Sequence, residues 1–172
     1  MLSGWHDFFV VLGAAAGTLI GAMFVVVSIG GGLVKGSALP SRIFVTPIIM
    51  HLAVVLLFCA VVLVPSMMRL RLGAMAGAVG IVFLAYAVRN AFHIRRRDRV
   101  EWSDHLWYAL CPVIAYLLMI AGAAMVLKSY PGAVDTIAFA LALLVVGGIR
   151  NAWDLILFFL ERQNTDRAAP PP

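Results

Sequence analysis

Residues 8–30 read FFVVLGAAAGTLIGAMFVVVSIG and carry no charged side chain. An α-helix needs about 20 predominantly apolar residues to cross the hydrocarbon core of a bilayer. This stretch is long enough, and the residues before it lack the Lys or Arg that opens a secretory signal peptide. It therefore predicts a retained transmembrane helix and, with it, a membrane-embedded fold.

Four further stretches match the first in length and apolar character. The second has no Asp, Glu, Lys or Arg, the third contains Arg89, the fourth is uncharged after its first residue, and the fifth contains Arg150 and Asp154. The predicted fold is an all-α membrane protein with a single domain over 1–165 and a disordered, proline-rich tail over 166–172. The five predicted transmembrane helices are 8–30, 43–64, 73–94, 105–127 and 134–159.

The composition of the whole chain agrees with this fold. Hydrophobic residues make up 63% of the 172 positions and charged residues 12%, whereas soluble domains have roughly 45–50% and about 25%. The net charge of +5 does not indicate a nucleic-acid surface, because the basic residues gather at the ends of the predicted helices. The expected surroundings are the lipid bilayer, and no nucleic acid is expected as a partner.

Lys and Arg residues are divided unequally between the two ends of the predicted helices. Loops rich in Lys and Arg stay in the cytoplasm, so the side with eight of these residues is predicted inside and the side with three outside. This orientation places the N-terminus outside and the C-terminus inside. The eight are Lys35, Arg42, Arg95, Arg96, Arg97, Arg99, Arg162 and Arg167, and the three are Arg69, Arg71 and Lys128.

Two helical hairpins of the chain share a sequence pattern. The second and fourth predicted helices each have a proline near the start and a polar ring four residues later, at His51 and Tyr116. The third and fifth each contain Arg-Asn-Ala before an aromatic residue, at Arg89–Phe92 and Arg150–Trp153. The pattern predicts a duplicated hairpin whose copies run in the same direction through the membrane, as in parallel transporter repeats. The first helix stands outside the repeat.

Glycines recur at every fourth position in the first predicted helix, at Gly13, Gly17 and Gly21. Glycines at this spacing line one face of a helix and let a second backbone approach closely. The face could pack against other helices of the same chain, or it could form the seam of a homo-oligomer. The sequence leaves both interpretations open.

Arg89 and Arg150 are the most informative polar residues, because an ionisable group inside a span costs several kcal/mol and usually marks a polar cavity or a partner. Either side chain could instead extend to the inner headgroups. Asp154 lies one helical turn beyond Arg150 and could pair with it. Together the inner-half residues predict a basic binding site that favours a small anion or an anionic lipid. The candidate site comprises His51, Arg89, Asn90, Tyr116, Arg150, Asn151 and Asp154.

No catalytic residue, cofactor or metal site is predicted. His51 is expected well inside the membrane, His93 and His105 near the cytoplasmic interface and His6 outside, so a pair of facing haem ligands is not expected. A phosphate-binding glycine loop, a zinc-protease pattern and a serine-hydrolase pattern are all missing from the sequence. An enzyme is therefore the less favoured class.

The pattern Phe8-Phe9-x3-Gly13-x-Ala15-x-Gly17-x3-Gly21-x2-Phe24-Val25-x2-Ser28 resembles the opening helix of small bacterial multi-pass membrane proteins. The resemblance covers the first predicted helix and carries no activity with it. It implies a location in the bacterial plasma (inner) membrane.

Three functions fit these observations. The first is a small channel or transporter that is expected to be a homo-oligomer, since five helices are few for a pathway through one copy. The second is a non-catalytic accessory subunit of a larger membrane complex, which small size and the lack of a soluble domain favour. The third is a protein that binds lipid headgroups through the basic inner-half residues.

Overall fold

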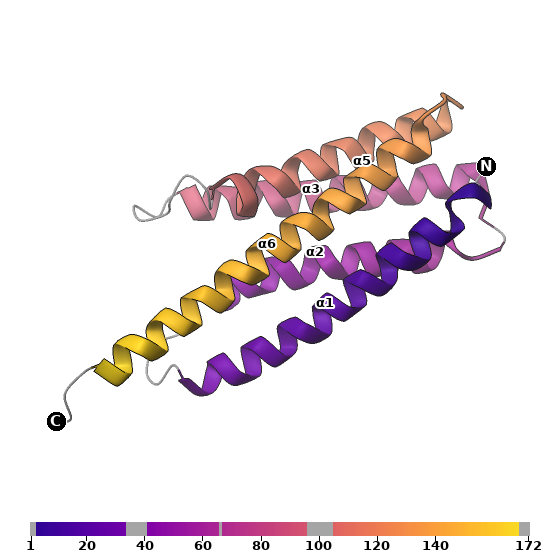
Figure 1. The fold of residues 1–172 in the computed structure, drawn as a ribbon. Coiled ribbons are helices and arrows are strands. Elements are labelled where there is room, and N and C mark those ends of the chain that lie inside the picture. Colours follow the sequence, from indigo (N-terminus) through magenta and orange to yellow (C-terminus); the bar gives the residue numbers. More distant parts are fainter. Residues whose placement is uncertain (1–2, 34–40, 66, 96–104, 169–172) are drawn as a thin grey trace.

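The computed structural model describes residues 3–33, 41–65, 67–95 and 105–168, and in these residues it contains helices and turns but no strand. A short 3₁₀ turn, Ser3–Trp5, leads into the first long helix, and a π-helical segment, His105–Leu110, runs directly into α5. The long helices in Figure 1 are α1 (His6–Leu33), α2 (Ser41–Val62), α3 (Arg69–Arg95), α5 (Cys111–Leu127) and α6 (Ala133–Ala168).

Four of these helices, and α5 together with the end of the π-helical segment before it, are long and apolar enough to cross a membrane, which confirms the predicted all-α fold and is compatible with a multi-pass membrane protein. The apolar part of α6 ends at Leu157, close to the predicted end of the last span, but the helix itself continues to Ala168. Of the predicted tail, residues 166–168 therefore belong to α6, and residues 169–172 lie outside the described residues. The loops over 34–40 and 96–104, which hold much of the basic charge used for orientation, also lie outside them.

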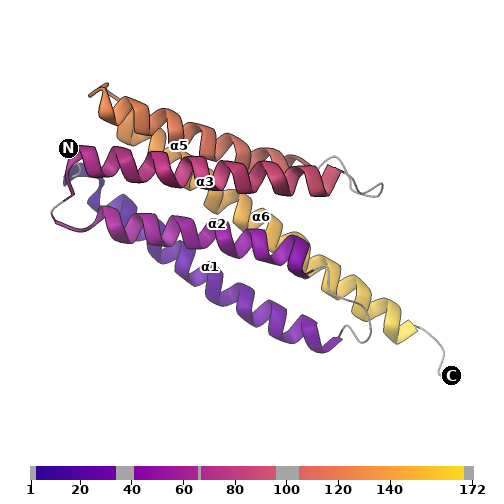
Figure 2. The same cartoon turned by 180° about the vertical axis from the view of Figure 1, so that it is seen from behind.

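The helices form two pairs joined by a crossing helix. Figures 1 and 2 show α1 with α2 on one side and α3 with α5 on the other, while α6 crosses between the pairs. The α6 helix packs on α5, α2 and α1, whereas α2 and α3 hardly touch although they are consecutive in the chain. The helices of the two predicted hairpins are therefore packed differently, closely in α5–α6 and loosely in α2–α3.

Small and large side chains explain why α3 packs on α5 rather than on α2. A Cβ atom at Gly80 would lie 2.7 Å from Cγ1 and 3.3 Å from the backbone nitrogen of Ile120, so glycine favours this close approach of α3 to α5. Between α3 and α2, by contrast, stand the rings of Tyr86 and His51, whose centroids are 6.0 Å apart. Two rings in contact keep the two backbones well separated.

The turn between α5 and α6 is closed by backbone hydrogen bonds. The amide of Tyr130 donates to the carbonyl of Met125 (2.9 Å), and the amide of Ser129 donates to that of Val126 (3.1 Å). This is the Schellman arrangement, which places the residue after the helix end in the left-handed region, and Ser129 has φ 61°. The tight turn holds α6 antiparallel against α5.

The core lies along α2 and α6. In each of these helices 56% of the apolar segment is buried inside the protein, whereas only 17% of the segment in α1 is buried. The large side chains that are completely enclosed include Phe9, Met23, Leu52, Tyr116 and Leu141. Most of α1 therefore presents its apolar surface to the outside of the bundle.

Candidate functional site

His51 on α2 and Tyr116 on α5 meet inside the bundle. The Nδ1 atom of His51 and the hydroxyl oxygen of Tyr116 are joined by a hydrogen bond of 2.8 Å. His51 is 5% exposed and Tyr116 is completely buried. The two rings that occupy matching positions in the predicted repeat are thus direct partners, a contact that the sequence pattern did not specify.

Further rings surround this pair. Phe83 of α3 stacks on Tyr116 with centroids 5.7 Å apart, and Tyr86 contacts His51 edge to face. The guanidinium carbon of Arg89 lies 5.8 Å from the centre of the Tyr86 ring, within the range of a cation–π contact. Arg89 is therefore linked to the His51–Tyr116 pair through Tyr86.

Asn151 of α6 is hydrogen-bonded to the π-helical segment. Its Nδ2 atom donates to the carbonyl of Trp107 (3.5 Å), and the hydroxyl of Tyr108 donates to the Asn151 carbonyl (3.0 Å). In the i→i+5 pattern of a π-helix the Trp107 carbonyl would pair with the amide of residue 112, and Pro112 has no N–H. The proline therefore leaves a free carbonyl that the asparagine side chain occupies.

Two consecutive glycines bring α6 close to both neighbouring helices just before Asn151. A Cβ atom at Gly147 would lie 2.9 Å from Sγ of Cys111 on α5, and one at Gly148 would lie 3.0 Å from Cδ2 of Leu52 on α2. Side chains at these positions would push the helices apart. The two glycines therefore permit the three-helix contact that places Asn151 near His51.

A small pocket lies where α2, α5 and α6 meet. It has room for about one water molecule. Two buried polar atoms of its lining residues have no hydrogen-bond partner among the residues that the structure describes: Nε2 of His51 and Oδ1 of Asn151. Asn151 is 4% exposed, so bulk water does not satisfy these atoms. The pocket is lined by Ile48, His51, Trp107, Cys111, Pro112, Leu144, Gly147, Gly148 and Asn151.

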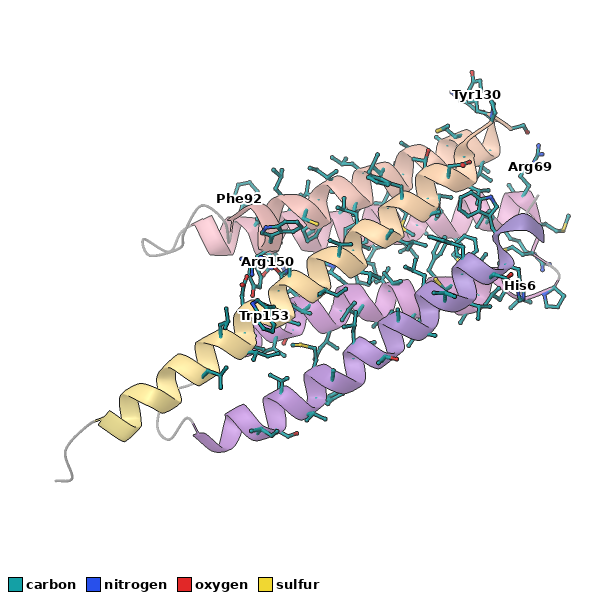
Figure 3. All side chains as sticks on the ribbon, viewed as in Figure 1. His6, Arg69, Phe92, Tyr130, Arg150 and Trp153 are labelled. Carbon is teal, nitrogen blue, oxygen red and sulfur yellow. The ribbon has the colours of Figure 1, made fainter. Side chains whose placement is uncertain are left out.

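Arg150 and Asp154 lie apart from the pocket and form the ion pair that their spacing predicted. Both side chains are partly exposed. Figure 3 shows Arg150 in the same half of the bundle as Phe92 and Trp153, and His6, Arg69 and Tyr130 toward the other end. Because Asp154 balances its charge, Arg150 adds little net positive charge to this half.

Arg89 differs from Arg150 in its surroundings. Its side chain is exposed, and the ion pairs among the described residues do not include it. The next residue, Asn90, points its Nδ2 atom into the protein, where the described residues offer it no partner. In both Arg-Asn pairs the arginine thus lies nearer the surface and the asparagine turns inward.

The three glycines of α1 have different environments. A Cβ atom at Gly13 would lie 3.1 Å from Cβ of Cys59, and one at Gly17 would lie 3.8 Å from Leu56, so both face α2. Nothing lies within 4 Å of such an atom at Gly21. Gly13 and Gly17 therefore pack within the chain, whereas Gly21 is open to the outside.

Several residues of the site were not singled out from the sequence: Tyr86, Trp107, Tyr108 and the glycines at 147 and 148. In the sequence, Pro112 could have indicated a freed carbonyl, and the adjacent glycines could have indicated close helix packing.

Comparison of the chain with protein-family models, with curated proteins and with solved structures finds no match.

Proposed function

We propose that this chain is a small channel or transporter of a bacterial plasma (inner) membrane, with its N-terminus outside and its C-terminus inside. The pathway favours a small anion and forms between copies of the chain in a homo-oligomer. The half of the bundle that holds Arg89 and Arg150 faces the cytoplasm in this proposal, in agreement with the excess of basic residues on that side.

The observation that carries the proposal is the contrast between Arg89 and Arg150. Both are arginines within membrane-spanning helices, but Arg150 is paired with Asp154 and Arg89 has no carboxylate partner among the described residues. An arginine in a span is costly unless it reaches water, a partner or a headgroup. Among the described residues Arg89 therefore supplies a positive charge without a carboxylate partner, which a mobile anion would balance.

An oligomer is proposed because the contact of α2, α5 and α6 is closely packed and its pocket admits about one water. The outer face of α1 is available for contact between copies, because Ala14, Gly21 and Ala22 are small and exposed. Small residues are the ones through which membrane helices associate closely. Arg89, being exposed, would face the pathway between copies.

Binding of an anionic lipid headgroup is a second candidate, favoured by the exposure of Arg89 on the surface of the bundle. The guanidinium forms strong hydrogen bonds with phosphate oxygens. In this case Arg89 holds a lipid and no solute crosses.

Anion efflux from liposomes tests the proposal. Chloride efflux through the purified protein is expected to fall at least about tenfold in Arg89→Gln, a barrier change of about 1.4 kcal/mol. Arg71→Gln removes an exposed arginine near the opposite end of α3 and is the matched control, with efflux expected unchanged. Wild-type protein that gives no efflux, or Arg89→Gln with wild-type efflux, would refute the anion pathway.

Native mass spectrometry separates the second candidate from the first. If Arg89 binds a headgroup, wild-type protein carries phosphatidylglycerol that Arg89→Gln loses and Arg71→Gln keeps, and no efflux is seen. Retained lipid in Arg89→Gln would exclude headgroup binding at this residue.

A further inference from the structure

We infer that the pocket between α2, α5 and α6 binds one ordered water molecule, which links His51 Nε2 to Asn151 Oδ1. The same geometry assigns the proton of neutral His51 to Nε2. This site involves neither Arg89 nor the outer surface, and the inference does not depend on the proposed transport function.

The first observation is that two residues lining the pocket, His51 and Asn151, each have a buried polar atom without a hydrogen-bond partner among the described residues. His51 and Asn151 are each more than nine-tenths buried, and both line the pocket. Buried polar atoms in native proteins nearly always have a hydrogen-bond partner, and ordered water supplies it where protein groups do not. Both atoms need a partner from the same small space.

Size and chemistry identify the occupant as water. The space holds about one water molecule, and the remaining lining is mostly apolar, including Ile48 and Leu144. An anion is disfavoured because Asn151 Oδ1 is itself an acceptor. A water molecule can accept from one partner and donate to the other, so it suits this pair.

The tautomer of His51 follows from counting the protons in the hydrogen bonds. Tyr116 is completely buried, and its hydroxyl is bonded to His51 Nδ1. If the Tyr116 hydroxyl donates, Nδ1 accepts and Nε2 carries the proton, which it donates to the water. If Nδ1 instead carried the proton, the hydroxyl hydrogen of Tyr116 would need an acceptor that the described residues do not provide.

The result is a continuous hydrogen-bonded chain across three helices. It runs from Tyr116 on α5 to His51 on α2, through the water to Asn151 on α6, and on to the Trp107 carbonyl just before α5. His51 and Asn151 then each have a hydrogen-bond partner at both polar ends of the side chain. The water thereby ties α6 to α2, which Gly148 brings close together.

Nitrogen NMR of protein labelled with ¹⁵N-histidine in lipid bilayers tests the inference, with the His51 signals assigned by their loss in His51→Gln. We expect a protonated Nε2, an unprotonated Nδ1, and rapid magnetisation transfer from water to the Nε2 proton. Asn151→Leu fills the pocket and should abolish that transfer, whereas Asn90→Leu, at the matching position on α3, should preserve it.

Three results would overturn the inference: a proton on Nδ1 with Nε2 free, a doubly protonated ring, or an Nε2 proton that receives no magnetisation from water. Each of these results is read from the wild-type protein once the His51 signals are assigned, so the outcome does not depend on whether Asn151→Leu folds. Because Arg89 is not part of the pocket, none of these results affects the anion efflux expected from Arg89.

Discussion

His51 and Asn151 are each held by one polar end and present the other end to the pocket. His51 is bonded through Nδ1 to Tyr116, and Asn151 is bonded through Nδ2 to the carbonyl of Trp107. These bonds hold one end of each side chain, and both residues line the pocket, so Nε2 and Oδ1 are the ends left for a further partner. Residues with this arrangement are positioned before any ligand binds, which lowers the cost of binding.

Tyr116→Phe is expected to destabilise the protein by about 1 kcal/mol, which is within the range measured for side-chain hydrogen bonds in membrane proteins. The change removes the hydroxyl and leaves Nδ1 of buried His51 without its partner. Thermal unfolding in detergent measures the effect. Tyr130→Phe removes an exposed hydroxyl and should leave the melting temperature unchanged. Equal stability of both variants would contradict the importance of the bond.

Asp154→Asn is expected to increase chloride efflux in the liposome assay by a few-fold. The substitution removes the carboxylate that balances Arg150 and so adds a second uncompensated arginine in the same half of the bundle. The matched variant Asp135→Asn removes an exposed carboxylate near the opposite end of α6 and should not increase efflux. Reduced or unchanged efflux in Asp154→Asn would show that the balance of charge at Arg150 does not control the anion.

The sequence singled out the polar residues of the candidate site as a hypothesis, but it did not predict most of their contacts. Arg150 and Asp154 were predictable as a pair because helical spacing alone brings them together. The bond between His51 and Tyr116 depends on how two separate helices pack, which local spacing does not determine. The contact of Asn151 with Trp107 depends in addition on the π-helical segment before Pro112, and periodicity does not reveal such a segment.

At the scale of the helices, α6 is the element that organises the bundle. Gly147 faces α5 and Gly148 faces α2, so consecutive positions serve two different contacts. The hydropathy pattern was sufficient to locate every long helix, because each needs only a run of apolar residues. The pattern did not show that α3 packs on α5 and stays apart from α2. That arrangement depends on glycines of α3 that face α5 and on the aromatic rings between α3 and α2.

Gly147→Leu is expected to destabilise the protein by about 1–3 kcal/mol, the usual cost of forcing extra atoms into a packed core. The new side chain would collide with Cys111 and push α6 away from α5. Val146→Leu changes the neighbouring residue, which is exposed, and serves as the control. Thermal unfolding compares the two variants, and a melting temperature for Gly147→Leu equal to that of the control would contradict the close helix contact.

At the scale of the whole molecule, α1 begins and α6 ends at opposite ends of the bundle (Figure 1), as expected if five helices each run from one end to the other. Single cysteines at Ser3 and Thr165, introduced after Cys59 and Cys111 are replaced by alanine, measure the orientation. A membrane-impermeant thiol reagent applied to intact cells should label the cysteine at 3 at once and that at 165 only after permeabilisation. Labelling in the reverse order would contradict the orientation inferred from the basic residues.

The reversal potential of the current across a planar bilayer, measured in a potassium chloride gradient, tests the central claim that Arg89 governs an anion pathway. The wild-type potential is expected near the equilibrium potential of chloride, because the uncompensated guanidinium attracts anions. Arg89→Glu should move it toward the equilibrium potential of potassium, because the charge at the pathway is reversed. Identical reversal potentials for the two proteins, or no current through the wild type, would contradict the claim.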